Sequence, residues 1–363
     1  MGKHSRSIRT HRRSSLLTLI VLLLLSWPAP AQESAIPISE CITCHGNEGL
    51  STTLPSGEEL PLWVDMKVFS ESVHAKAGLT CVSCHRDITG FPHPPLAVRD
   101  RRELSLRYYT NCRTCHQEQY RATLDSIHLR VLAAGHREAP VCTDCHGAHN
   151  ITPPAQPRLK IDLTCGRCHE QIFDIYKESV HGADLIRDQD HPDVPTCTDC
   201  HGVHQIEDPR TLEFRLRSPQ ICANCHADPV KMSKYGLSTA VLRSYVADFH
   251  GTTVQLFQKR PGARLNEAVC YDCHGVHDIK SAKDPESRVI KENLLKTCQQ
   301  CHPTATANFP TAWVKHYNPS PTEFPLVYYV ELFYKILIPA VIGFFVVFIL
   351  LDAAHRAFGG KPA

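Results

Sequence analysis

The short motif C-x-x-C-H constrains this chain more than any other feature of its sequence. It occurs nine times in 363 residues and uses all 18 cysteines. In this motif the two thiols bind a c-type haem covalently and the histidine binds its iron. We therefore predict nine covalently attached haem c groups. The predicted attachment cysteines are Cys41, Cys44, Cys81, Cys84, Cys112, Cys115, Cys142, Cys145, Cys165, Cys168, Cys197, Cys200, Cys222, Cys225, Cys270, Cys273, Cys298 and Cys301. The predicted iron ligands within the motifs are His45, His85, His116, His146, His169, His201, His226, His274 and His302.

Two other uses of paired cysteines explain less of this pattern. A disulfide framework in an exported protein would also contain an even number of cysteines. Zinc ribbons also contain C-x-x-C pairs. Neither requires a histidine after every second cysteine, whereas all nine pairs here have one. Covalent haem attachment is therefore the interpretation that accounts for the whole motif.

The composition predicts a fold organised by its prosthetic groups. Only 42% of the residues are hydrophobic, and the chain has three tryptophans and 26 prolines. Between the two ends of the chain the apolar content is modest, so side chains alone would bury too little surface. Each haem is a large apolar disc that can replace them. The predicted fold is mainly α, with little β and much irregular chain wrapped round nine covalent c-type haems.

Residues 1–31 have the pattern of a signal peptide. Met1–Arg13 is basic without an acid, Leu16–Leu25 is apolar, and Ala29-Pro30-Ala31 fits a cleavage site. A retained N-terminal anchor is the alternative, but the apolar run is short for a membrane span. Export agrees with the high cysteine content. It also agrees with haem attachment, which takes place outside the cytoplasm.

Residues 326–351 form a candidate transmembrane helix. The segment is almost continuously apolar and has the length that a span requires. Arg356 and Lys361 follow it, so the tail at 352–363 is expected to stay cytoplasmic. The haem domain, residues 32–323, would then face the periplasm or the outside of the cytoplasmic membrane. No histidine lies between residues 317 and 351, so quinone chemistry in the bilayer would belong to a partner.

Histidines outside the motifs recur in a regular order. One follows each odd-numbered motif, and another follows each even-numbered motif. The repeat units are residues 41–93, 112–149, 165–204 and 222–277, with a half unit at 298–316. His136 and His191 are spare, and the sequence leaves open whether either replaces an assigned ligand. The predicted second iron ligands are His74, His93, His128, His149, His181, His204, His250, His277 and His316.

Chain geometry limits which iron each of these histidines can bind. His201 and His204 are three residues apart, so their Cα atoms are at most about 10 Å apart. Two imidazoles on opposite sides of one iron need roughly 13 Å between their Cα atoms. His204 must therefore serve a neighbouring haem, and the same holds for His149 and His277. Gly147, Gly202 and Gly275 follow the motif histidines, where a sharp turn favours positive φ.

Two segments between the motifs are predicted to be helical, Gln117–His128 and Glu170–His181. The charge pattern gives no sign of a nucleic-acid partner. The net charge is +2, and removing the five basic residues of the signal segment leaves −3.

The doubled motifs, with Ser179-Val180-His181-Gly182 and His201-Gly202-Val203-His204, resemble a known group of proteins. The resemblance is to multihaem c-type cytochromes of the cytochrome c3-like and cytochrome c554-like group. This group is related to octahaem tetrathionate reductase and hydroxylamine oxidoreductase. The resemblance covers about residues 41–316 and implies close-packed haem pairs, bis-histidine iron and electron transfer. Two features differ from other multihaem proteins. NapC/NirT quinol dehydrogenases are anchored at the N-terminus with fewer haems, and the C-x-x-C-K motif of pentahaem nitrite reductases is absent here.

Together these features predict a membrane-anchored nonahaem cytochrome of anaerobic-type respiration. It would transfer electrons between a quinone-reactive membrane subunit, such as a b-type cytochrome, and soluble or outer-membrane cytochromes, in a direction that the sequence leaves open. We assign no catalytic residue. The alternative is a reductase of a nitrogen or sulfur oxyanion with one open iron. His74 lies far from its motif and His93 stands in F-P-H-P, so haem 1 or 2 is the candidate open site. A third hypothesis is a structural subunit with redox-inactive haems.

Overall fold

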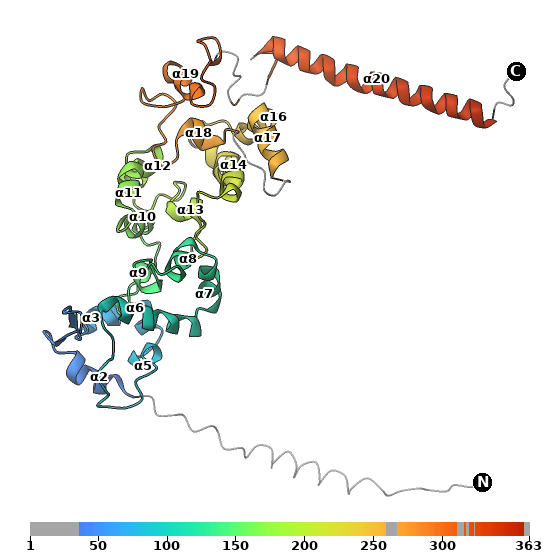
Figure 1. The fold of residues 1–363 in the computed structure, drawn as a ribbon. Coiled ribbons are helices and arrows are strands. Elements are labelled where there is room, and N and C mark those ends of the chain that lie inside the picture. The colour runs from blue at the N-terminus through green and yellow to red at the C-terminus, as the bar shows by residue number, and fades with distance from the viewer. Residues whose placement is uncertain (1–35, 259–266, 311–315, 317–318, 323, 359–363) are drawn as a thin grey trace, which may run out of the picture. The chain divides into compact units, whose positions relative to one another are not determined.

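The computed structural model describes residues 36–258, 267–310, 316, 319–322 and 324–358 (Figure 1). The predicted signal peptide, residues 1–31, lies outside the described residues. Within the described ranges the chain is mainly helical, and its strands form one two-stranded sheet. The predicted mainly α fold with little β is thus confirmed. The chain forms two compact units, and their boundary passes through the predicted repeat unit 112–149.

Unit 1 contains residues up to His116 together with Val141–Thr152. Its sheet is an antiparallel hairpin in which Thr52 is opposite Leu60. Its strands are β1 (Ser51–Thr53) and β2 (Glu59–Pro61). Its helices are α2 (Ile38–His45), α3 (Met66–Glu71), α4 (Val73–Lys76), α5 (Cys81–Cys84), α6 (Arg101–Tyr108), the 3-10 helix η1 (Tyr109–Thr114) and α9 (Cys142–His146).

Unit 2 contains Gln117–Pro140 and the chain from Pro153 onward. Its elements are all helices within the described residues. They are α7 (Gln117–Leu124), α8 (Ile127–Ala133), α10 (Leu159–Gly166), α11 (Glu170–Lys177), α12 (Val180–Arg187), α13 (Cys197–His201), α14 (Leu212–His226), α15 (Pro229–Ser233), α16 (Val241–Ala247), α17 (Phe249–Phe257), α18 (Cys270–His274), α19 (Lys291–Gln299) and α20 (Pro325–Phe358).

The two predicted helices between motifs are each divided in two. The segment from Gln117 forms α7 and α8, and the segment from Glu170 forms α11 and α12. Ser126 and Ser179 are the cause, because each adopts an extended backbone and caps the N-terminus of the second helix. The hydroxyl of Ser126 accepts the N–H of His128, and that of Ser179 accepts the N–H of Gly182. The prediction of one continuous helix was therefore wrong at these serines.

The residue after each capping serine joins a distant part of the chain. The N–H of Ile127 donates to the carbonyl of Ile206 at 2.8 Å, and that of Val180 donates to Ile279 at 2.9 Å. In unit 1 the N–H of Val73 donates to Ile151 in the same way. Each acceptor lies two residues beyond an H-G-x-H histidine. Backbone hydrogen bonds therefore link one repeat unit to the next.

Among the described residues, the clusters of buried apolar side chains are small. One buried cluster contains Leu54, Leu60 and Val98, and another contains Leu159, Leu185 and Val194. Such clusters are too small to hold a chain of this size together. This agrees with a fold that depends on bound groups for its apolar interior.

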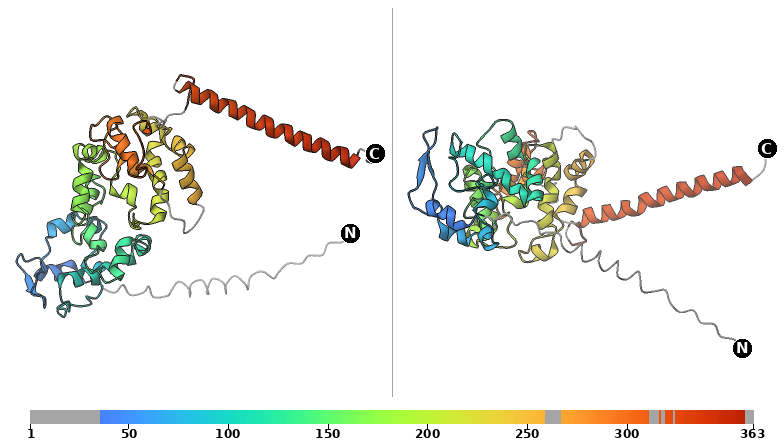
Figure 2. Two further views of the ribbon diagram at one scale, coloured as in Figure 1. Left: turned by 45° about the horizontal axis from the view of Figure 1, so that its top comes forward. Right: turned by 90° about the horizontal axis from the view of Figure 1, so that it is seen from below.

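Helix α20 contains the predicted transmembrane segment. It is 34 residues long, its most apolar window has a mean hydropathy of 2.7, and none of that window is buried against the protein. Figure 2 shows it as one uninterrupted helix. Glu331 and Lys335 form an ion pair at 2.6 Å, one turn apart. By length and composition α20 is able to cross a membrane.

Candidate haem sites

Eight pairs of histidine rings lie opposite one another at almost the same separation. The distance between ring centroids is 6.0 Å in the closest pairs and 6.2 Å in the widest. Each pair combines one motif histidine with one histidine outside the motifs. The pairs are His45 with His93, His116 with His74, His85 with His149, His169 with His128, His226 with His181, His201 with His277, His302 with His250, and His274 with His316.

This separation fits an iron bound between the two rings. A metal–imidazole bond is about 2 Å long, so two rings that bind one iron from opposite sides have centroids about 6 Å apart. The angle between the ring planes varies from 5° in one pair to 55° in another. Such variation agrees with rotation of each ring about a shared nitrogen–iron–nitrogen axis. The residues present therefore fit a haem with two histidine ligands.

Neighbouring repeat units exchange histidines. His181 of the unit 165–204 lies opposite the motif histidine His226 of the next unit. In return, His277 of that next unit lies opposite His201 of the first. His128 likewise lies opposite His169, one unit further along the chain. The structure thus gives a pairing that the sequence left open.

The remaining histidines differ in position. His146 belongs to unit 1 and His204 to unit 2, and their roles as ligands stay predictions from the sequence. Both spare histidines make local contacts. Nδ1 of His136 lies 3.2 Å from a carboxylate oxygen of Glu138, and Nδ1 of His191 accepts the N–H of Asp193 at 3.3 Å.

Burial keeps several paired imidazoles neutral. Removal from water and, to a smaller extent, the nearby His226 together lower the pKa of His181 to about 4. Burial likewise lowers the pKa of His274 to about 4, with a smaller effect from His316. A neutral imidazole has a free lone pair, which is the form that binds a metal. These sites are therefore prepared for metal binding at neutral pH.

The attachment cysteines of successive motifs lie side by side. The first cysteines of motifs 3 and 4 are hydrogen-bonded, which lowers the pKa of Cys112 to about 7 and raises that of Cys142. The same contact occurs in three further pairs of motifs. These are Cys41 with Cys81, Cys165 with Cys197, and Cys222 with Cys270. Groups attached at these positions would be neighbours.

An aspartate in three even-numbered motifs was missed by the sequence reasoning. Asp144, Asp199 and Asp272 each occupy the third position of C-x-D-C-H. Each carboxylate accepts the N–H of the residue before the motif, at 2.6 to 2.7 Å. Each also forms an ion pair with an arginine. The repeated aspartate was visible in the sequence, whereas its arginine partners are distant in the chain.

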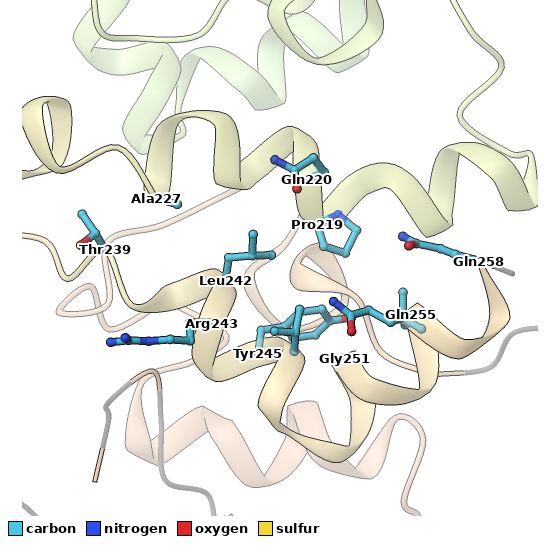
Figure 3. A pocket seen from close by; sticks show the side chains of 12 residues that line it. Pro219, Gln220, Ala227, Thr239, Leu242, Arg243, Tyr245, Gly251, Gln255 and Gln258 are labelled. Carbon is cyan, nitrogen blue, oxygen red and sulfur yellow. The ribbon is translucent and has the colours of Figure 1, made fainter. Parts of the chain in front are cut away.

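Two hollows in unit 2 differ in their relation to the motifs. One, of about 270 Å³, is lined by Cys200 and His201, which belong to a C-x-x-C-H motif. The other, of about 370 Å³, lies between α14, α16 and α17 (Figure 3). Pro219, Leu242 and Tyr245 form part of its apolar wall, and Gln255 also lines it. None of its lining residues belongs to a C-x-x-C-H motif.

The chain is similar to known cytochromes. Residues 73–170 and 136–227 match the family model for Cytochrome c3. A curated relative, Multiheme cytochrome MtrA of Shewanella baltica (strain OS185), is 26% identical over 198 residues. This match covers 52% of the chain and 52% of the relative, so it spans about half the length of that protein. No solved structure matches the chain. With its repeated attachment motifs and paired histidines, the chain is a multihaem c-type cytochrome.

Proposed function

We propose that the protein is a membrane-anchored electron-transfer cytochrome with nine haem c groups. It exchanges electrons with a quinone-reactive membrane subunit, such as a b-type cytochrome, and with soluble or outer-membrane cytochromes in anaerobic-type respiration. When bound, haem c supplies a one-electron couple at its iron. The eight histidine pairs are the observation that carries this proposal, because two imidazoles leave no position on an iron for substrate.

The sequence left open whether His74 and His93 bind an iron, and their positions support electron transfer. His93 lies opposite His45, and His74 lies opposite His116, both with centroids 6.0 Å apart. His85, the motif histidine of haem 2, lies opposite His149. Haems 1 and 2 would each have two histidine ligands, so the geometry favours electron transfer over reduction of an oxyanion.

Hydrogen bonds to Nδ1 orient several of the imidazoles. Nδ1 of His45 is 2.5 Å from the carbonyl of Leu62, and Nδ1 of His93 is 3.0 Å from that of Pro94. Nδ1 of His250 is 3.3 Å from a carboxylate oxygen of Asp248. When Nδ1 carries the proton and donates it to such an acceptor, Nε2 is left free for a metal. These contacts support ligation through Nε2.

The close spacing of the haem-attachment cysteines supports a path for electrons from haem to haem within each compact unit. Besides the paired first cysteines, Cys84 interacts with Cys112 and Cys115 in unit 1. In unit 2, Cys200 interacts in the same way with Cys222 and Cys225. Consecutive attachment sites are thus neighbours within a pair and also between pairs. A protein that only stored electrons would not need each haem to lie next to the following one.

Helix α20 supports a single C-terminal membrane anchor. With a cleaved signal peptide and Arg356 beyond the span, the haem domain would face the periplasm. A partner within the bilayer would carry out the quinone chemistry, because the predicted span contains no histidine.

A stopped-flow experiment tests the proposed function. The purified full-length protein in detergent, loaded with haem and reduced by dithionite, is mixed with an oxidised c-type cytochrome. In parallel it is mixed with nitrite, hydroxylamine or tetrathionate. We expect rapid oxidation of all haems by the cytochrome and no catalytic turnover with the small molecules. Steady turnover with any of these small molecules would contradict the proposal.

A further inference from the structure

We propose that Arg102, Arg158 and Arg215 are positioning residues that hold haem-attachment motifs together in pairs. Each lies before an odd-numbered motif and binds the aspartate of the following even-numbered motif. This inference rests on the proposed haem pairs and adds the residues that set their geometry.

The contact between Arg215 and Asp272 is the most complete of the three. Nη1 donates to Oδ1 at 3.2 Å, and Nη2 donates to Oδ2 at 2.8 Å. Nη2 also donates to the carbonyl of Glu267 at 2.9 Å, and Nη1 donates to the hydroxyl of Tyr271 at 3.1 Å. The guanidinium lies over the ring of Tyr271, 5.5 Å from its centroid. A planar guanidinium makes such two-pronged contacts, whereas a lysine does not.

Arg158 makes a similar set of contacts in the preceding repeat unit. Its Nη2 donates to Asp199 at 3.2 Å and to the carbonyl of Val194 at 2.8 Å. Val194 lies three residues before Cys197, just as Glu267 lies three residues before Cys270. In both repeat units the arginine therefore binds the aspartate of the even-numbered motif and the carbonyl of the residue three positions before that motif.

Arg102 provides the corresponding contact in unit 1. Its Nη1 donates to Asp144 at 2.7 Å. The arginine side chain is 22% exposed and the aspartate side chain 38%, so the pair is partly shielded from water. The ion pair thus recurs in three repeat units. The arginine stands seven residues before the odd-numbered motif for Arg158 and Arg215, and ten residues before it for Arg102.

The aspartate connects the ion pair to the attachment helix. In α18, Asp272 accepts the N–H of Val269 at 2.7 Å and thereby caps the helix that begins at Cys270. Movement of this carboxylate would therefore move the helix that carries the cysteine. An arginine that holds the carboxylate also holds the helix.

Helix geometry explains how the ion pair brings two cysteines together. Arg215 and Cys222 are seven residues apart in α14, so they lie on the same face, two turns apart. Asp272 stands two residues after Cys270. With the ion pair formed, the thiols of Cys222 and Cys270 are hydrogen-bonded. The ion pair therefore sets the spacing and the angle between two attachment sites.

The first repeat unit supplies an internal reference. Its even-numbered motif has Ser83 in place of the aspartate, and this hydroxyl accepts the N–H of Thr80 at 3.1 Å. A neutral serine cannot form an ion pair with an arginine. Cys41 and Cys81 are nevertheless adjacent, so their haems should be unaffected by changes to the three arginines.

Arg215→Met and Arg215→Lys in the haem-loaded, full-length protein test the proposal. Arg187→Met is the matched control, because Arg187 forms an ion pair with Asp184 within α12, and neither residue belongs to an attachment motif. Mass spectrometry gives the number of attached haems. The Soret circular dichroism couplet reports how neighbouring haems are oriented, and a potentiometric titration reports their reduction.

We expect Arg215→Met to keep its haems but to lose part of the couplet and to shift part of the titration curve. Arg215→Lys should show a smaller change in both, and Arg187→Met should show none. A couplet and titration curve identical to those of the wild type in Arg215→Met would overturn the proposal. If Arg215→Met loses a haem, Arg215→Lys decides the test. An unchanged couplet in a fully loaded Lys variant would overturn the proposal too.

Failure of the underlying haem pairs would look different. A wild-type protein with nine haems but no couplet would overturn both the haem pairs and the role of the arginines. Unchanged variants of a wild type that has a couplet would overturn the role of the arginines alone.

Discussion

At the scale of single residues, the chain places each imidazole by fixing the residues around it. His181 follows the capping Ser179 and precedes Gly182, and all three lie at the start of α12. The ring of His181 faces that of His226, whose motif lies in the next repeat unit. One predicted ligand thus comes from one repeat unit and its partner from the next, so a change at one residue is expected to affect two repeat units.

Replacing His277 with alanine should open one iron. The ring of His277 lies 6.1 Å from that of His201, so the iron between them would lose one of its two ligands. We expect one haem to become high-spin and to bind cyanide, while the others stay low-spin. Ferric EPR with and without cyanide measures this. His136→Ala is the control, since His136 is exposed and pairs with Glu138. A purely low-spin spectrum of fully loaded His277→Ala would contradict the assignment.

Replacing Gly182 with alanine should destabilise the fold. A Cβ there would overlap the carbonyl oxygen of Tyr176 and would lie 2.7 Å from the Cα of Lys177. Overpacking of this kind costs about 1–3 kcal/mol, because the backbone has to shift. Thermal unfolding of the haem-loaded protein should show a lower Tm. Gly90→Ala, where a Cβ meets nothing within 4 Å, should leave Tm unchanged. Equal Tm values for both variants would count against the close approach.

The sequence was sufficient to select histidines outside the motifs, because Ser-x-His and H-G-x-H recur. The sequence was not sufficient to show which histidines pair, because the pairing depends on how neighbouring repeat units pack within each compact unit. His277 could not reach the iron of His274, but nothing in the chain pointed specifically to His201. Arg158 was missed for a similar reason, since its partner Asp199 lies 41 residues away.

At the scale of elements, short helices and their caps carry the attachment sites. The even-numbered motifs of α9, α13 and α18 each form a five-residue helix that begins at the first cysteine. The glycine that follows each helix has positive φ, at 79°, 81° and 85° respectively. Sequence patterns predicted helices at Gln117 and Glu170, but they did not show that a serine would divide each one. A serine within a polar segment gives little periodic signal, whereas its effect on the backbone is large.

Replacing Ser179 with alanine tests the cap of α12. The hydroxyl is buried and accepts the N–H of Gly182 at 3.1 Å. Loss of an N-cap costs about 1 kcal/mol, and α12 also positions His181. We expect a lower free energy of unfolding in guanidinium, measured by the Soret absorbance. Ser244→Ala does not remove an N-cap and serves as a control for loss of a hydroxyl near a paired histidine, His316. A free energy of unfolding unchanged in Ser179→Ala would show that the cap contributes little.

At the scale of the whole molecule, the described side chains bury little apolar surface of their own. Each of the two buried clusters consists of three residues. The fold class could be predicted from the sequence, because its modest apolar content and its nine C-x-x-C-H motifs together indicate that haem takes the place of an apolar side-chain core. The division into two compact units could not be predicted from the sequence, because the boundary follows contacts between distant segments rather than the repeat pattern.

The chain without haem should therefore not fold. Cytoplasmic expression of residues 32–324, without the signal and outside the attachment machinery, would give such a chain. We expect low helix content by far-UV circular dichroism, no cooperative melting and rapid proteolysis, because the apolar interior would be missing. The same segment exported and loaded with haem is the control. Cooperative melting of the haem-free chain would show that side chains alone stabilise the fold.

The central claim is that every iron has two histidine ligands, and ferric EPR of the haem-loaded protein tests it most directly. The number of haems per chain is measured on the same sample by mass spectrometry. We predict nine haems and only low-spin signals, unchanged by nitrite, hydroxylamine or cyanide. A high-spin signal of about one haem per chain, shifted by an added ligand, would contradict this account.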